Sequence, residues 1–276
     1  MSERMKKDEE ILVSVITVSY NAMKTIGQTI ESVLGQTYRN IEYIIIDGGS
    51  TDGTVEVIKD YVRRTKELES EGVRELGRTI IWSSEPDKGI YDAMNKGIRK
   101  ATGKLIGIVN ADDWYEPQAV ETMVAAYKAA DKPDESVYYG MLRIWRDEKE
   151  YCVRRFHHRL IPEMVVQHPT NFVPKRMYDE LGLFNDSYRI AADYELQNRF
   201  RIHRVEFVPV EGVISNFRLG GASDRMTKEQ LLEMPTIQLK FGMISQEQYD
   251  AEYKRIMNKP NLWRRIKRAI KYVVHG

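Results

Sequence analysis

The chain has 276 residues, a length that suits one large α/β domain or one domain with an appendage. Apolar residues make up 42% and charged residues 30%, so the chain can bury a substantial core and is not wholly disordered. The 42 Lys and Arg residues nearly balance the 41 Asp and Glu residues, which argues against a general nucleic-acid binder. The single cysteine excludes an internal disulfide and a thiolate metal cluster.

This near-neutral sum conceals an uneven distribution of charge. Eight cations and no acid follow Glu252, which leaves 34 cations against 41 acids, a net charge of −7, for residues 1–252. We therefore expect an acidic body with a basic tail.

The first 130 residues alternate between strand and helix patterns. Runs rich in β-branched residues predict buried strands at Ile11–Val18, Ile41–Ile46, Thr79–Trp82 and Lys104–Val109. Amphipathic spacing predicts helices at Thr25–Leu34, around residues 55–62, at Tyr91–Ala101 and after Pro117. Such alternation is typical of right-handed βαβ units, so we expect an α/β fold with a mostly parallel central sheet flanked by helices.

The second half of the chain is less regular. Strands are predicted at Ser136–Trp145 and Glu150–Phe156, an antiparallel pair across a polar turn, and again at Val205–Val210. Helices are predicted at Asp193–Phe200, Thr227–Phe241 and Ser245–Met257. These patterns predict a catalytic or binding domain over residues 1–225 and a helical extension over residues 226–276.

Polar clusters follow three of the predicted strands. They are TVSYN at 17–21, DGGSTDG at 47–53 and NADD at 110–113. Open parallel sheets bind ligands at the carboxyl ends of their strands, so Ser19 and Asn21 are candidate nucleotide contacts together with their neighbours. There is no GxGxxG after the first strand and no GxxxxGK[ST], which argues against dinucleotide oxidoreductases and P-loop NTPases.

The acids in these clusters would repel a bare phosphate, and a divalent cation resolves that conflict. Asp112 and Asp113 offer the hard oxygen ligands that Mn²⁺ or Mg²⁺ prefers while bridging a diphosphate. Alternatively, they cap the helix that follows. Asp47 suits a base or a ribose hydroxyl, and its alternative role is an Asx turn before Gly48.

At this point a resemblance emerges. The segments SVITVSYNAMKTIGQTIESVLGQTY, IIIDGGSTDGT, SEPDKGIYDAMNKGIRKATGKLIGIVNADDW and AADYEL, spread over residues 11–218, resemble family 2 glycosyltransferases of the GT-A fold. The bacterial O-antigen and capsule transferases of this family are the most similar in pattern. The resemblance implies a GT-A, Rossmann-like fold and a nucleotide-sugar donor.

The resemblance also implies roles for single residues. Thr17, Tyr20 and Asp47 would contact the nucleoside, and the aspartate pair at 112–113 would contact ribose and metal. Asp193, in AADYEL, would be the general base; capping of its helix is the alternative role.

Two positions depart from the family pattern. The second motif often reads DD, whereas this chain has Gly48 as its second residue, so nucleoside contacts are expected to differ. The metal motif often reads DAD, whereas here its first position is Asn110. Metal dependence is still expected because Asp112 and Asp113 remain.

Several further residues have a functional and a structural interpretation. Lys88, in the turn EPDKG, would reach a phosphate or remain a solvated turn residue. Trp114 would stack on a sugar or pack in the core. His168 would face the acceptor or be structural, and Glu195 competes with Asp193 for the base role.

Residues 217–223, FRLGGAS, are expected to form a loop that closes over the donor. The two adjacent glycines would supply its mobility, and Arg218 would meet the diphosphate.

The basic tail has the pattern of an amphipathic helix. Seven residues share one face, Leu262, Trp263, Ile266, Ala269, Ile270, Val273 and Val274, and the cations fill the other. This pattern favours an anionic membrane surface, while packing on the body or homodimer formation remains an alternative. With no signal peptide and no apolar run long enough to span a membrane, we expect a cytoplasmic location, peripheral on the inner face of the membrane.

Together these features predict an inverting, metal-dependent glycosyltransferase. It would move a sugar from a UDP- or GDP-sugar to a hydroxyl of a surface glycan, with a lipid-linked glycan as one form of the acceptor. The alternative is a non-catalytic nucleotide-sugar-binding subunit or regulator that retains the fold.

Overall fold

The computed structural model describes residues 10–70, 80–161, 165–220 and 226–258. The chain divides into two compact units, residues 1–224 and 225–276, and each is described by itself. Residues 259–276, which include the predicted amphipathic tail helix, lie outside the described part of the chain.

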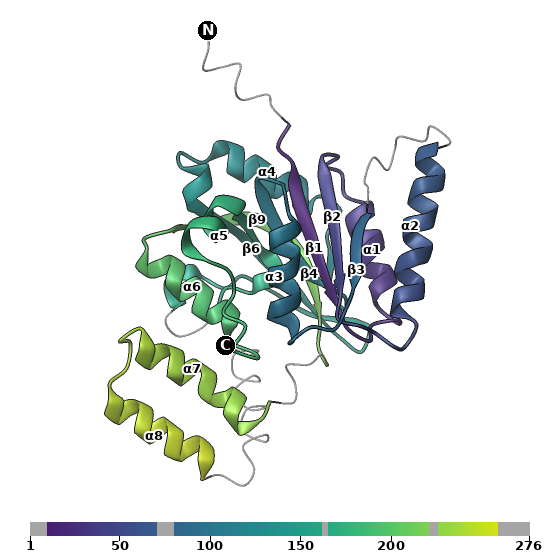
Figure 1. Ribbon diagram of the computed structural model, residues 1–276. Coiled ribbons are helices and arrows are strands. Elements are labelled where there is room, and N and C mark those ends of the chain that lie inside the picture. The colour runs from purple at the N-terminus through teal and green to yellow at the C-terminus, as the bar shows by residue number, and fades with distance from the viewer. Residues whose placement is uncertain (1–9, 71–79, 162–164, 221–225, 259–276) are drawn as a thin grey trace. The chain divides into compact units, whose positions relative to one another are not determined.

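A mixed sheet runs through the first unit (Figure 1). Among the described residues it has nine strands in the spatial order β3-β2-β1-β4-β8-β6-β9-β5, with β7 paired to β6. The strands are β1 Val13–Ser19, β2 Ile41–Asp47, β3 Ile80–Ser84, β4 Leu105–Asn110, β5 Trp114–Tyr115, β6 Ser136–Arg146, β7 Lys149–Arg154, β8 Asn171–Pro174 and β9 Glu206–Arg218.

Strands β3, β2, β1 and β4 run parallel, as predicted from the alternation of strands and helices. Strand β1, VSVITVS, is buried along its whole length because helices cover both faces of this part of the sheet. The second half is mixed: β8 and β6 pair antiparallel, β9 pairs parallel to β6, and β6 and β7 form the predicted antiparallel hairpin.

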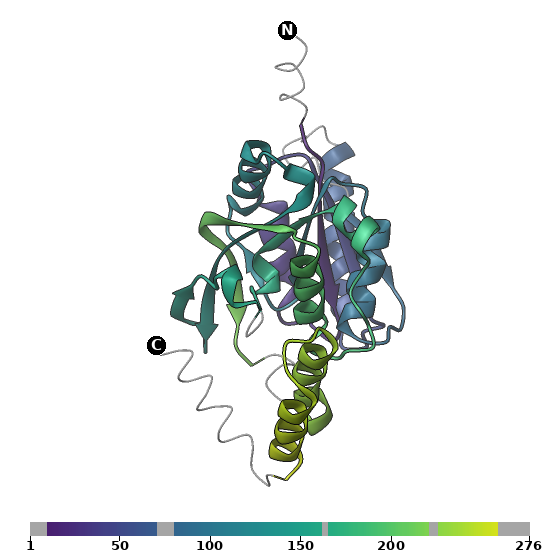
Figure 2. The same cartoon turned by 90° about the vertical axis from the view of Figure 1, so that its left-hand side faces the viewer.

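Helices pack on both faces of the sheet (Figures 1 and 2). Those of the first unit are α1 Ile26–Leu34, α2 Thr54–Ser70, α3 Ile90–Lys100, α4 Ala119–Ala129, α5 Lys175–Leu181 and α6 Ala192–Ile202. Short 3₁₀ turns lie at Pro133–Glu135, His158–Leu160 and His168–Thr170.

Two separate cores follow from the alternation of side chains along each strand. Val13 and Val15 of β1 point to the face covered by α1, α2 and α4, whereas Ile16 and Val18 point to the face covered by α3, α5 and α6. Helix α3 packs closely on the sheet at Gly97, which has no side chain. A Cβ atom at this position would be only 2.5 Å from Cγ2 of Ile16.

The strand order fixes where a ligand can bind. Strand β1 lies between β2 and β4. The connection that follows β1 leads to β2 on one side, whereas β4 is added later on the other side, so the strand order reverses at β1 and leaves a crevice at its carboxyl end. In open α/β sheets the crevice at such a point is the usual binding site.

The second unit contains helices α7 Lys228–Lys240 and α8 Gln246–Met257, close to the predicted bounds. Each begins at a capping box, formed by Thr227 with Gln230 and by Ser245 with Gln248. Searching the described residues reveals no helix with the length and apolar character needed to cross a membrane.

Candidate active site

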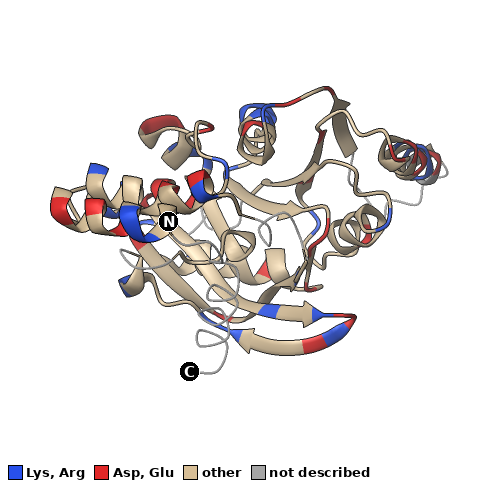
Figure 3. Ribbon diagram, turned by 90° about the horizontal axis from the view of Figure 1, so that it is seen from below, with Lys and Arg blue, Asp and Glu red and all other residues tan. Residues whose placement is uncertain are grey.

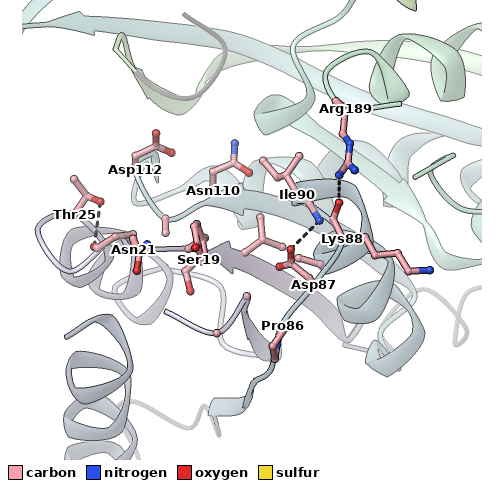
Figure 4. Close-up of a pocket in the computed structure, with 18 of the residues that line it drawn as sticks. Ser19, Asn21, Thr25, Pro86, Asp87, Lys88, Ile90, Asn110, Asp112 and Arg189 are labelled. Carbon is pink, nitrogen blue, oxygen red and sulfur yellow. Dashed lines mark hydrogen bonds between the residues drawn. The ribbon is translucent and has the colours of Figure 1, made fainter. Parts of the chain in front are cut away.

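A cleft of about 830 Å³ opens at the carboxyl ends of β1, β2, β3 and β4. Its lining combines the turn after β1, the glycines after β2, the loop between β3 and α3, and the end of β4. The polar or charged residues in the lining are Ser19, Tyr20, Asn21, Thr25, Asp87, Lys88, Asn110, Asp112 and Arg189 (Figure 4). Five of the predicted nucleotide contacts therefore come together here: Ser19, Tyr20, Asn21, Lys88 and Asp112.

Asp47, a predicted nucleoside contact, is fully buried at the end of β2 and is not part of the cleft lining. Its carboxylate accepts hydrogen bonds from the hydroxyls of Ser19, Ser50 and Ser84 and from the backbone N–H groups of Gly49 and Ser50. Burial alone would raise the pKa of Asp47, but these hydrogen bonds outweigh it and hold the pKa below its usual value. The side chain thus organises the loop after β2.

Thr17 also lies away from the cleft. It is fully buried, and its Oγ1 is 3.0 Å from the hydroxyl of Tyr43 on the neighbouring strand. Asn21, by contrast, lines the cleft with a positive φ of 49°. It ties the turn after β1 to the loop after β2, because its Oδ1 accepts from Thr51 N and its own N–H donates to Ser50 Oγ.

The two aspartates after β4 have different surroundings. Asp112 lines the cleft, whereas Asp113 is fully buried beneath it and accepts a hydrogen bond from the backbone N–H of Arg218 at 3.1 Å. Desolvation raises the pKa of Asp112 above its usual value. Burial and then the nearby charge of Asp112 raise the pKa of Asp113 well above its usual value. A positive charge at this point of the cleft would favour the ionised form of both groups.

The prediction that Arg218 belongs to a mobile loop is wrong for this residue. Phe217 and Arg218 are the last residues of β9 and pair with Ile144 and Trp145 of β6, so the backbone here is part of the sheet. The guanidinium of Arg218 donates to the backbone oxygen of Asp112 at 3.0 Å.

Further contacts hold the same guanidinium in place. It donates to Gln28 Oε1 at 2.9 Å and lies 5.0 Å from the ring centroid of Trp114. Arg218 thus fixes the turn that carries the two aspartates. Residues 221–223 of the predicted loop lie outside the described part of the chain.

Trp114, a predicted sugar contact, belongs to the short strand β5 and does not line the cleft. Its ring contacts both the Arg218 guanidinium and Trp145, with ring centroids of the two tryptophans 5.5 Å apart. Its backbone pairs with Asn216 of β9.

The oxygen donors at the end of β4 fit a divalent cation that is shared with a substrate. The described residues contain no group of three or more His, Cys, Asp or Glu side chains able to hold a metal unaided. Instead, Asp112 offers a carboxylate to the cleft. The buried Oδ1 of Asn110, which is also in the lining, has no hydrogen-bond partner among the residues that the structure describes. Mg²⁺ and Mn²⁺ commonly take one or two protein oxygens and complete their shells with substrate phosphates and water.

Asp193 and His168 come together in a second, smaller cavity of about 20 Å³. Asp193 lies in the first turn of α6, and its Oδ1 accepts from Tyr194 N at 2.8 Å and from the hydroxyl of Tyr91 at 3.2 Å. Tyr91 directly follows Ile90, which lines the main cleft. Asp193 is therefore adjacent to the cleft rather than in it.

His168 lies between the two cavities. It lines the smaller one, and its Nε2 is 3.5 Å from Nδ2 of Asn110, which lines the main cleft. Burial lowers the pKa of His168 to about 4, so the ring is neutral near pH 7.

Glu195, the competitor for the base role, is placed differently. It is buried, lines neither cavity, and forms an ion pair of 2.7 Å with Arg199 one turn further along α6.

Sequence reasoning missed two charged residues of the cleft, Asp87 and Arg189. Asp87 lies in the turn EPDKG, in which the sequence predicts a functional role only for Lys88. Arg189 comes from a segment with no recognisable motif, and its guanidinium donates to the backbone oxygen of Lys88. Figure 4 shows Arg189 meeting this oxygen while the amino group of Lys88 points away from Asp112.

Comparisons with known proteins agree with this arrangement. Residues 14–185 match the family model described as "Glycosyl transferase family 2". An uncharacterized glycosyltransferase of Mycobacterium tuberculosis is 34% identical over 190 residues, which are 66% of each chain. A PGL/p-HBAD biosynthesis glycosyltransferase of Mycobacterium bovis is 25% identical over 235 residues, 84% of this chain and 87% of that protein. The match thus spans slightly less than two thirds of the first relative's length.

Solved structures of glycosyltransferases share the fold. Residues 1–349 of TarS from S. aureus, in complex with UDP, give a TM-score of 0.60 at 14% identity, covering 91% of this chain and 72% of that one. The mannosyltransferase PcManGT from Pyrobaculum calidifontis, in complex with GDP-Man and Mn²⁺, gives 0.57 at 18% identity, covering 90% and 70%.

These neighbours confirm the predicted GT-A fold, and the family model and named relatives confirm the predicted resemblance to family 2 glycosyltransferases. The match of residues 14–185 includes β1 to β4, whose carboxyl ends form the cleft. The chain belongs to glycosyl transferase family 2.

Proposed function

We propose that the protein transfers a sugar, with inversion at the anomeric carbon, from a nucleoside diphosphate donor to a glycan hydroxyl. The observation that carries this proposal is Asp112, a carboxylate at the end of β4 that faces a cleft large enough for a nucleotide sugar. Neighbours in complex with UDP, UDP-GlcNAc and GDP-Man support a UDP- or GDP-sugar as donor.

A divalent cation at Asp112, with Asn110 as a second oxygen donor, would stabilise the charge of the departing diphosphate. Mn²⁺ in the complexes of PcManGT and GalNAc-T7 supports Mn²⁺ or Mg²⁺ in this role. The raised pKa values of Asp112 and Asp113 oppose ionisation, so cation binding is expected to release protons and to strengthen as pH rises. Arg218 maintains the backbone of Asp112 in position.

Asp193 is proposed as the general base. Inversion requires one displacement: the acceptor oxygen bonds to the anomeric carbon on one face while the bond to the diphosphate oxygen breaks on the other. The proton of the acceptor hydroxyl goes to the carboxylate of Asp193. The backbone N–H of Tyr194 donates to Oδ1 and orients this carboxylate, and the Tyr91 hydroxyl, which shares its proton between Ile190 O at 2.9 Å and the same Oδ1 at 3.2 Å, assists.

The acceptor is proposed to be a surface glycan of the O-antigen or capsule type, lipid-linked in one form. The relative named for PGL/p-HBAD biosynthesis supports a role in glycan assembly. The eight cations after Glu252 would hold the protein on an anionic membrane, on its cytoplasmic face.

Release of nucleoside diphosphate tests the proposal. The protein is incubated with Mn²⁺ and a panel of UDP- and GDP-sugars, with and without a bacterial glycolipid extract, and both the diphosphate and the glycosylated product are measured. Asp112→Asn should abolish metal-dependent release. Asp193→Asn should bind the donor normally and lower transfer by about 10²–10⁴-fold.

Asp186→Asn is the matched control, because Asp186 is an exposed acid that lines neither cavity and precedes α6. It should transfer at the unaltered rate. Tight nucleotide binding without release from any donor would favour a non-catalytic nucleotide-sugar-binding subunit. Normal transfer by Asp193→Asn would remove that residue from the base role.

A further inference from the structure

Gly48 and Asp87 fit each other across two loops of the cleft. A Cβ atom at Gly48 would lie 2.3 Å from Oδ2 of Asp87 and 3.4 Å from Cδ2 of Tyr20. The first distance is shorter than any ordinary contact, so a side chain at position 48 and the carboxylate of Asp87 cannot both occupy this place. Because Gly48 has no side chain, the carboxylate of Asp87 from the loop after β3 has room here. Gly48, Asp87 and Tyr20 all line the cleft.

The carboxylate of Asp87 has one oxygen fixed by the protein. Its Oδ1 accepts a hydrogen bond of 2.8 Å from the backbone N–H of Gly89 (Figure 4). Its Oδ2 is the atom next to Gly48, and within the described part of the chain this oxygen accepts no hydrogen bond. An ionised carboxylate only accepts hydrogen bonds, so Oδ2 is suited to a donor on a ligand.

The charge of Asp87 restricts which part of a nucleotide sugar it can meet. It would repel the diphosphate, whose place is at Asp112 under the proposed function. Figure 4 shows Asp112 and Asp87 in separate parts of the cleft, with Ser19 between them. Asp87 therefore faces an uncharged portion of the donor that carries N–H or O–H groups, which leaves the nucleobase, the ribose and the transferred sugar.

Tyr20 favours the nucleobase over the ribose and over the transferred sugar. Its side chain is 67% exposed, and its ring borders the same space beside Gly48. Stacking of a base on an aromatic ring contributes about 1–3 kcal/mol and does not depend on the base. A base stacked on Tyr20 would present its hydrogen-bonding edge within reach of Asp87, while Gly48 permits the close approach.

We propose that Asp87 selects the nucleobase of the donor. Its Oδ2 accepts a hydrogen bond from a ring N–H, as at N3 of uracil or N1 of guanine. Cytosine and adenine carry a lone pair at the corresponding ring nitrogen, which the carboxylate repels. The inference rests on the proposed function because it takes the ligand to be a nucleoside diphosphate.

Isothermal titration calorimetry of the full chain with UDP, GDP, CDP and ADP in the presence of Mg²⁺ tests the proposal. UDP or GDP should bind roughly 10- to 100-fold more tightly than CDP and ADP, the range expected for a hydrogen bond to a charged group. In Asp87→Asn, the N–H of Gly89 keeps the amide oxygen at the Oδ1 position. The amide NH₂ then takes the place of Oδ2 and becomes a donor toward the base.

Asp87→Asn should therefore lower the affinity for UDP or GDP by about tenfold or more. It should raise the affinity for CDP, because N3 of cytosine accepts a hydrogen bond. Glu85→Gln is the matched control: Glu85 precedes Asp87 in the same loop, pairs with Lys96 at 3.2 Å and does not line the cleft. It should leave all four affinities unchanged. Equal melting temperatures would verify that both variants are folded.

Two results would overturn the assignment. If Asp87→Asn loses the same fraction of its affinity for all four diphosphates, the carboxylate contacts the ribose and does not select the base. If none of the four affinities changes, Asp87 does not contact the nucleotide. If the unmodified protein binds none of the diphosphates, the proposed function itself fails, and this outcome is separate from both.

Discussion

At the scale of single residues, the surroundings of each acid decide its role. Asp47 and Asp112 both lie at the carboxyl ends of buried strands of the same sheet, yet Asp47 is surrounded by hydroxyl and N–H donors while Asp112 faces the cleft. Hydrogen bonds lower the pKa of Asp47 and burial raises that of Asp112. The sequence predicts both acids at strand ends, but the donor from Ser84 lies 37 positions away from Asp47 and has no local signal.

The same limit applies to Asp87, Arg189 and Gly48. The departure at Gly48 is visible in the sequence, but its consequence depends on a loop almost forty positions later that brings Asp87 into the vacant space. Arg189 reaches the cleft from the segment before α6. Asp87 lies within a recognised motif, but its place beside Gly48 depends on the packing of two loops, and Arg189 lies in no motif at all.

His168 provides a residue-scale prediction about pH. Burial lowers its pKa to about 4, while the unfolded chain has a value near 6.5. Between these values the unfolded state binds more protons, so the free energy of unfolding falls as pH drops from 6.5 toward 4. His168→Gln should remove this term, and urea unfolding should show the unmodified protein losing about 2 kcal/mol more than the variant between pH 7.5 and 5.

His203→Gln is the control, because His203 is exposed at the end of α6. It should retain the full pH dependence of the unmodified protein. An unchanged slope in His168→Gln would show that the ring at 168 titrates normally.

At the scale of elements, the periodicity of apolar residues is sufficient to predict the parallel half of the sheet and the β6–β7 hairpin. The end of β9 was not predictable. Phe217 and Arg218 precede a glycine-rich stretch whose pattern predicts a loop. They extend β9 instead, because they pair with Ile144 and Trp145 of β6. Strand β5 has two residues and exists only through its pairing with β9. Strand pairing across long separations thus overrides the local pattern.

Helix α3 allows a prediction at this scale. Asn95 is buried, and its side chain donates to Phe184 O at 2.8 Å and accepts from Phe184 N at 3.0 Å, which joins α3 to the segment that leads to α6. Asn95→Ala should lower the free energy of unfolding by about 2–4 kcal/mol, because two buried backbone groups lose their partner. Chemical denaturation provides the measurement.

Arg99→Ala in the same helix is the control, since Arg99 is exposed, and it should change stability by less than about 0.5 kcal/mol. Asn95→Ala should also lower transfer more than its loss of folded protein explains, because the anchored segment carries Arg189 and leads to Asp193. A variant that is destabilised but fully active when folded would separate this anchor from the site.

At the scale of the whole molecule, the near-zero net charge has to be divided by region. In the first unit the charges are mixed: Figure 3 shows Lys and Arg interleaved with Asp and Glu on α2, where Arg63 pairs with Asp60 and Glu67. The eight cations after Glu252 have no acid among them or after them. A surface that attracts anionic lipid is therefore expected from the position of the cations and not from their sum.

Two full-length variants with the same net charge test this prediction. The first replaces Arg264, Arg265, Lys267 and Arg268 with Gln; the second replaces four exposed cations of α2, Lys59, Arg63, Arg64 and Lys66, with Gln. Sedimentation with phosphatidylcholine vesicles that contain about one quarter phosphatidylglycerol should show weaker binding only for the first variant. The loss should approach 4 kcal/mol, on the order of a thousandfold in partitioning, at about 1 kcal/mol per cation.

Salt distinguishes attraction of the tail from other causes. Raising the ionic strength to about 1 M shortens the Debye length to about 3 Å, so the difference between the first variant and the unmodified protein should disappear. Equal vesicle binding by all three proteins at low salt would refute the membrane proposal and leave packing on the body or a homodimer as the role of the tail. Equal weakening of both variants would show that only the sum of charges matters, contrary to the regional argument.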